Sequence, residues 1–219
     1  MRPFGFRLAP NGIMSNNKWT AETTTIDYSG AYDLDLSTDL STTVSWGAQA
    51  VETEENNVIG YSETFPGPVE PTLSSGSLKL AFEDRIRVIN AGFFGQVRIG
   101  WRDRVFVTGG LRVDGNSAFG ESLGLEPYPK VSASWVVSEE DFWPESMGNV
   151  KFRGALGSSG RAPGAFDAVQ TWFTGAPLGD RPAFLPENLG NEELGPERTT
   201  EIEVGFDGTF VGDRLTTEF

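Results

Sequence analysis

Two residue types that build many catalytic and metal sites are missing from this chain. It contains no cysteine, which excludes disulfide bonds and thiolate metal ligands. It contains no histidine, which excludes histidine general bases, Ser-His-Asp triads and histidine-ligated zinc within its 219 residues. The carboxylates Glu139, Glu140 and Asp141 fall on a predicted turn and not in a cleft. We therefore expect no enzymatic activity, no cofactor and no metal.

Long apolar runs and positive charge are also scarce. No stretch reaches the ~18 apolar residues of a transmembrane helix, and residues 1–8 lack the apolar core of a signal peptide. Lysine and arginine number 17 against 31 acidic residues, which gives a net charge of -14. Such a chain repels phosphate backbones, so we expect no nucleic-acid partner.

The pattern that is present has a period of two. With 27 Gly, 13 Pro and 12% aromatic residues, the composition suits strands joined by turns. Apolar and polar residues alternate in seven segments: 26–34, 40–50, 93–102, 105–114, 130–138, 150–157 and 201–210. An eighth strand is expected over 213–219. In each of the seven, one phase carries every charge and the other carries none.

Successive strand residues point to opposite faces, so this alternation predicts a two-faced sheet. The uncharged face is expected to include Val97, Val107, Leu111, Trp135 and Phe206. The charged face is expected to hold a set that would face the lumen of a barrel: Arg98, Arg112, Asp114, Lys151, Arg153, Glu201 and Glu203. A protein core and a lipid bilayer both exclude unpaired charge, so the uncharged face alone does not decide between them.

The links between predicted strands alternate in length. Those at 35–38, 102–104 and 211–213 are short, the one at 139–148 is intermediate, and those at 52–86, 115–128 and 160–197 are long. Short turns at one end and long loops at the other are typical of outer-membrane β-barrels. The sequence thus predicts an all-β, antiparallel, up-and-down transmembrane segment of about eight strands. The alternative is a self-contained ligand-binding module, either a small closed barrel or a soluble sandwich.

Aromatic residues provide a further check on strand direction. Five lie on the apolar phase toward the short-turn end: Tyr32, Trp101, Trp135, Phe152 and Phe210. This placement predicts an interfacial girdle. The alternative is that aromatic residues are simply common in strands, and Trp46, which falls in mid-strand, does not fit a girdle.

Several runs resemble a known family. They are GFFGQV (92–97), WRDRVFVT (101–108), LRVDGNSAFG (111–120), YPKVSASW (128–135) with SEEDFW (138–143), VKFRGALGSSG (150–160) and NLGNEELGPERTTE (188–201). In this order they resemble the SusC/RagA-type TonB-dependent outer-membrane transporters. The resemblance is close over about 90–219 and loose over 20–90.

The resemblance implies a barrel of about 22 strands whose lumen is closed by a separate plug domain. Residues 1–219 would then be part of that barrel, an open curved sheet without the plug and N-terminal domains. It further implies import of an oligosaccharide or peptide, energy from the TonB complex, a SusD-like surface lipoprotein as partner and contact with outer-membrane lipid.

Three loop motifs have two interpretations each. Trp172 and Phe173 in loop 160–197 are candidate ligand contacts, because exposed aromatic rings stack on sugars and apolar side chains, or else belong to a small core of that loop. The acidic run 52–57 is either a solvated loop base or a cation-attracting vestibule. Residues 114–117 favour a turn over a calcium site, because few oxygen ligands are local.

Overall fold

The structure is a computed structural model that describes residues 10–68, 71–119, 124–178, 181–212 and 214–219. It divides into two compact units, one of Met1–Thr24 and Glu52–Val88 and one of Thr25–Val51 and Ile89–Phe219. Within the described ranges, the regular elements are strands and two short 3-10 helices, Val137–Glu139 and Glu145–Met147. None of the helices described is long and apolar enough to cross a membrane.

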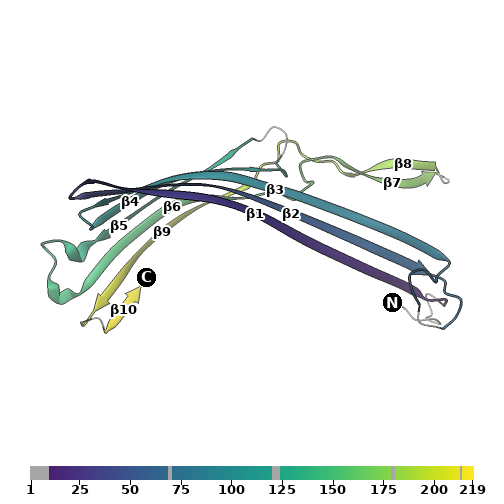
Figure 1. The fold of residues 1–219 in the computed structure, drawn as a ribbon, viewed down its shortest axis with the longest axis horizontal. Helices are drawn as coiled ribbons and strands as arrows, with labels where there is room; N and C mark the ends of the chain where they lie inside the picture. Colours follow the sequence, from purple (N-terminus) through teal and green to yellow (C-terminus); the bar gives the residue numbers. More distant parts are fainter. Residues whose placement is uncertain (1–9, 69–70, 120–123, 179–180, 213) are drawn as a thin grey trace. The chain divides into compact units, whose positions relative to one another are not determined.

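Eight strands form one sheet in chain order (Figure 1). They are β1 (Ile13–Ser37), β2 (Leu40–Glu63), β3 (Leu78–Trp101), β4 (Val105–Asn116), β5 (Glu126–Val136), β6 (Asn149–Arg161), β9 (Glu197–Phe210) and β10 (Leu215–Glu218). Every pair from β3 to β10 is antiparallel. In the part of the chain that is described, β1 and β10 lie at opposite ends of the order and do not pair. The predicted all-β, up-and-down and open sheet is confirmed.

The first three strands are much longer than the alternation predicted, with 25, 24 and 24 residues. The expected loop 52–86 is wrong in extent, because β2 continues to Glu63 and β3 begins at Leu78. In the β2 extension polar residues occupy both phases. In the β3 extension the apolar residues Leu78, Leu80 and Phe82 occupy the phase opposite to that of Phe93 and Val97, so the alternation of the predicted strands continues into neither extension. The acidic run 52–57 is therefore part of a strand and not the base of a loop.

Two of the predicted short links are present at one end of the second unit, the first at 38–39 where 35–38 was predicted and the second at 102–104 as predicted. β1 joins β2 through residues 38–39, and β3 joins β4 through 102–104. The two links touch, since the Arg102 amide donates to the Asp39 carbonyl at 2.7 Å. Arg102 and Asp103 both have positive φ, 51° and 55°, the geometry of a type I′ hairpin turn. The link after β9 includes residue 213, which lies outside the described residues.

The loop 160–197 contains a hairpin that the sequence did not predict. β7 (Thr171–Leu178) pairs with β8 (Arg181–Asn188) as a separate two-stranded sheet (Figure 1). Residues 179–180 of its tip, and residues 120–123 of the predicted loop 115–128, lie outside the described part. Two of the three prolines at 177, 182 and 186 fall in β8, and prolines normally argue against a strand, which is why alternation did not reveal this one.

Few apolar side chains are buried in the described residues. Those that are buried lie at loops and strand ends: Phe65, Ala118, Tyr128, Val137, Val150 and Ala168. The apolar phase of the strands is instead exposed. A soluble sandwich buries that phase against a second sheet, so this alternative is not supported.

Candidate functional site: the two faces of the sheet

One face of the second unit is uncharged across five strands. Residues opposite each other in an antiparallel ladder point to the same side of the sheet. The ladders align one row from β3 to β9: Ile99, Val107, Ala133, Gly154 and Val204. The next row is Val97, Gly109, Val131, Leu156 and Ile202. The predicted apolar face is confirmed, and it is open to its surroundings, since Val107 is 44% exposed and Val204 79%.

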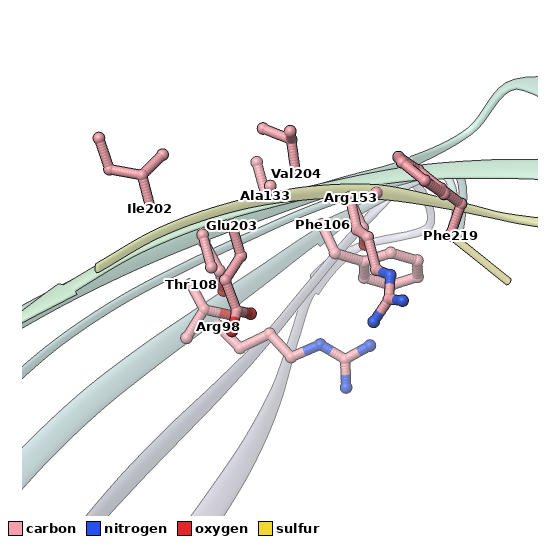
Figure 2. A pocket seen from close by; sticks show the side chains of 14 residues that line it. Arg98, Phe106, Thr108, Ala133, Arg153, Ile202, Glu203, Val204 and Phe219 are labelled. Atoms are coloured by element: carbon pink, nitrogen blue, oxygen red, sulfur yellow. The ribbon is translucent and has the colours of Figure 1, made fainter.

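The other face carries the charges. Shifting each position by one residue gives the row Arg98, Thr108, Ser132, Ala155 and Glu203. Figure 2 shows Arg98, Thr108 and Glu203 on one side of the strands and Ala133, Ile202 and Val204 on the other. All seven residues predicted for this face lie on it, because Arg112, Asp114, Lys151, Arg153 and Glu201 share its phase.

Two ion-pair clusters occupy this charged face. The Arg112 Nε donates to the two Asp114 carboxylate oxygens at 2.8 and 2.9 Å, and its Nη2 donates to Gln49 Oε1 at 3.2 Å. Gln49 in turn donates to Asp27 at 2.7 Å. In the second cluster, Arg153 bridges to carboxylates of β9 and β10. The first cluster lies within β4 and reaches β2 through Gln49, whereas the second joins β6 to its neighbour β9.

Arg153 lies 3.4 Å from Asp207 and 2.7 Å from Glu218, and Lys151 lies 3.5 Å from Asp207. By contrast, the described residues provide no ion-pair partner for Arg98, Glu201 or Glu203. The Arg98 guanidinium lies over the Phe106 ring at 4.6 Å. These three charges are therefore available to groups outside the sheet.

A hollow of about 800 Å³ lies on the charged face (Figure 2). Its polar lining comes from Arg98, Arg153, Glu203, Thr108 and Ser132. The small residues Ala155 and Gly205 also line the hollow, together with the ring of Phe106. We find no set of catalytic groups in it.

The uncharged phase ends at a defined point on β2 and β3. Glu52 continues the phase of Ala48 and Ala50, and Arg87 continues that of Ile89. The Arg87 Nε donates to Glu52 Oε1 at 2.7 Å. This hydrogen bond lowers the pKa of Glu52 and raises the pKa of Arg87. On β2 and β3, the alternate residues that are uncharged in the second unit therefore become charged at Glu52 and Arg87, where the strands enter the first unit.

A row of aromatic rings crosses the apolar face near the short links. The ladder aligns Trp101, Val105, Trp135, Phe152 and Phe206, and Phe219 continues it by exchanging two backbone hydrogen bonds with Phe206. The rings of Phe206 lie 6.4 Å from Phe152 and 6.1 Å from Phe219. The sequence prediction missed Phe206 and Phe219 for this row and chose Phe210, which lies four residues further along β9.

The candidate ligand contacts of the hairpin do not form one surface. Trp172 pairs with Pro186 and Phe173 with Leu185, so the two rings point to opposite faces of the hairpin. Trp172 is 52% exposed and Phe173 47%. Phe184 is 75% exposed and shares the face of Trp172, because it pairs with Thr174. Alternation within β7 would have revealed this, had a strand been expected there.

Two residues of the remaining acidic motifs, Glu140 and Asp114, have structural partners. Glu140 accepts from Trp135 Nε1 at 3.0 Å and from Arg104 at 3.2 Å, which fixes the link after β5. Asp114 is paired with Arg112. Across the residues that the structure describes, no group of three or more acidic side chains is placed to hold a metal ion.

Comparison with known proteins identifies the family. A family model described as TonB dependent receptor-like, beta-barrel, matches residues 3–219. The chain belongs to the TonB-dependent receptor β-barrel family. Two curated relatives, the TonB-dependent receptors P26 and P39 of Formosa agariphila, are 30% and 27% identical over 142 and 129 residues. The alignments cover 58% and 57% of this chain but only 14% and 12% of the relatives.

Solved structures agree on the fold of this receptor segment. The RagAB peptide transporter matches with a TM-score of 0.88 and 17% identity, over 95% of this chain and 24% of that chain. The RagAB peptide importer in the open-open state matches with a TM-score of 0.84 and 16% identity, over 94% and 23%. The resemblance to SusC/RagA-type barrels is confirmed, and the chain spans less than a quarter of these structures.

Proposed function

We propose that this chain forms part of the wall of an outer-membrane TonB-dependent transporter that imports a bulky nutrient. The observation that supports this most is the sheet with one uncharged, exposed face and one charged face. A soluble monomer rarely leaves so large an apolar surface uncovered. A barrel wall needs such a surface against lipid and a polar one toward its interior.

In this proposal the uncharged rows contact outer-membrane lipid and the aromatic row lies at headgroup depth. The charged face lines the lumen, with Arg98, Arg112, Asp114, Lys151, Arg153, Glu201 and Glu203 facing a plug or water. The plug and N-terminal domains would belong to other parts of a longer protein. The TonB complex would supply energy through those parts.

The long links would then lie on the extracellular side. A SusD-like surface lipoprotein is the proposed partner there, and the cargo is an oligosaccharide or a peptide. Two of the structures that share the fold are named as peptide transport proteins, which favours the peptide.

The test uses the parent transporter in its native cell. The Trp172→Ala/Phe173→Ala variant should reduce nutrient uptake or lipoprotein binding, while barrel assembly stays normal. The single variants Trp172→Ala and Phe173→Ala test the contribution of each face of the hairpin separately. Asp103→Asn, in a short turn at the other end of the sheet, tolerates the positive φ at this position; it is the control and should leave uptake unchanged. Normal uptake by the loop variant together with loss in the turn variant would show that the orientation is inverted.

A further inference from the structure

The β7–β8 hairpin has two edges of different chemistry. The described part of the chain gives it no third strand, so each strand has one unpaired side. β8 contains Pro182 and Pro186, which have no N–H to donate, and Glu187 lies beside Pro186. Residues 171–176 of β7 contain neither proline nor charge. Natural proteins use proline and charge to block exposed strand edges, so β8 is protected, whereas β7 is open over residues 171–176 and its one proline, Pro177, comes after that stretch.

Pro186 also indicates which β7 amides point outward. Proline occurs in a strand where its nitrogen faces away from the neighbouring strand. Pro186 pairs with Trp172, so the backbone groups of both residues point away from each other. By alternation Thr174 points outward like Trp172, while Phe173 points toward Leu185.

The side chains around these outward amides suit a sequence-tolerant ligand. Trp172 and Phe173 extend to opposite faces of the hairpin and are both about half exposed, at 52% and 47%. An extended peptide added beside β7 would receive backbone hydrogen bonds from Trp172 and Thr174, and its alternating side chains would contact one ring above and one below.

We infer that the free edge of β7 captures peptides as an added strand, through their main chain and not through a particular side chain. The inference rests on the proposed function and assigns its cargo to the peptide class. It also explains why Trp172 and Phe173 lie on opposite faces of the hairpin. The side chains of an added strand alternate between the two faces and can contact both rings, whereas a single sugar ring can stack on only one of them.

The test measures peptide binding to the intact parent transporter in detergent. The probe is a five-residue peptide of alternating alanine and threonine, compared with two versions that are N-methylated at alternate residues in opposite phases. In each version, methylation removes the N–H groups that point to one side of the extended peptide and blocks strand pairing on that side only. We expect one version to bind at least about fivefold more weakly and the other to match the parent peptide, since each backbone hydrogen bond contributes roughly 2- to 10-fold.

Substitutions at one cross-strand pair provide the matched control. Thr174→Pro removes an outward amide from β7 and should weaken binding by at least about fivefold, while Thr174→Ala keeps the amide and should bind normally. Phe184→Pro places the same residue on the directly opposite position of β8 and should bind normally. An equal loss in Thr174→Ala, or a loss confined to Phe184→Pro, would overturn the assignment.

Hydrogen exchange on the unmodified transporter tests the same inference without any variant, so the result does not depend on whether a variant folds. Peptide addition should protect the amides of Trp172 and Thr174 and leave Phe173 unchanged. If peptides are imported but both methylated probes bind equally and these amides stay unprotected, the strand-addition inference fails and the transport function stands. If the assembled barrel imports neither peptide nor oligosaccharide, the proposed function itself fails.

Discussion

The two faces of the sheet are made by the same five strands and differ by a shift of one residue. The row through Val107 has no charge, and the row through Thr108 ends in Arg98 on β3 and Glu203 on β9. A soluble single sheet would show the reverse exposure, with its apolar face covered. In the proposed barrel wall the surroundings on the two sides differ, with hydrocarbon on one and water or polar protein on the other.

The largest expected effect comes from placing the same charge on both faces. Val131→Arg puts a guanidinium on the uncharged face in the row of Gly109, midway between the rows of Val105 and Val113, and should destabilise the barrel by about 2–4 kcal/mol. Ser132→Arg puts it one residue away on the charged face, between the neutral partners Thr108 and Ala155, and should cost less than about 0.5 kcal/mol. Urea stability of the parent protein in lipid bilayers measures the difference. Equal costs of the two substitutions would contradict the assignment of the uncharged face to lipid.

A smaller effect concerns the pairing that the charged face requires. Arg112→Leu leaves Asp114, whose side chain is only 15% exposed, without its cation. We expect a loss of about 1–2 kcal/mol, because an unpaired and partly buried carboxylate loses solvation without compensation. Arg112→Leu/Asp114→Leu should recover part of that loss. A double variant no more stable than the single one would show that the pair is not coupled.

On the apolar face, the aromatic row allows a matched pair of Trp→Phe substitutions, which remove the same ring atoms at two positions. Trp135→Phe removes the indole N–H that bonds to Glu140 at 3.0 Å and should cost about 0.5–1.5 kcal/mol. Trp101→Phe in the same row is the control, since the described residues show no partner for its N–H, and it should cost less. Thermal denaturation of the parent in detergent distinguishes the two.

The smallest effect lies where the uncharged phase ends. Arg87 lowers the pKa of Glu52, so their pair stabilises the folded strands above the ordinary pKa of a glutamate and is lost as pH falls through the lowered value. Glu52→Gln should flatten the acid dependence of hydrogen exchange in β2 and β3. Arg87→Gln should do the same, and the double variant should add nothing. Unchanged acid dependence in either single variant would contradict the pairing.

The alternation of apolar and charged residues was enough to predict which side chains share a face. Successive residues of a strand point to opposite faces, and the ladders between strands align residues of the same kind. Every residue assigned to the charged face lies there, from Arg98 on β3 to Glu203 on β9. The short links also followed from the sequence, since the strands on both sides of Arg102 and Asp103 have clear phases.

What could not be predicted lies where the apolar phase is lost or changes. The extension of β2 beyond Glu52 is polar on both sides. The extension of β3 before Arg87 alternates, with Leu78, Leu80 and Phe82 on one phase, but this phase is opposite to that of Phe93 and Val97, so the two patterns do not join into one strand. The β7–β8 hairpin carries aromatic residues on both faces and prolines in β8, and both features hide a strand. Phe206 was missed in the aromatic row because its depth depends on inter-strand register, which a single sequence does not contain.

The claim that the uncharged face contacts lipid is tested most directly by labelling single cysteines in the parent transporter. The chain itself has no cysteine, so any introduced thiol within it is unique there. A lipid-soluble reagent should label Val107→Cys, Ala133→Cys and Val204→Cys in bilayers and not Thr108→Cys, Ser132→Cys and Glu203→Cys. Labelling of the second set from the lipid phase, or an equal response at Val107 and Thr108, would contradict the account.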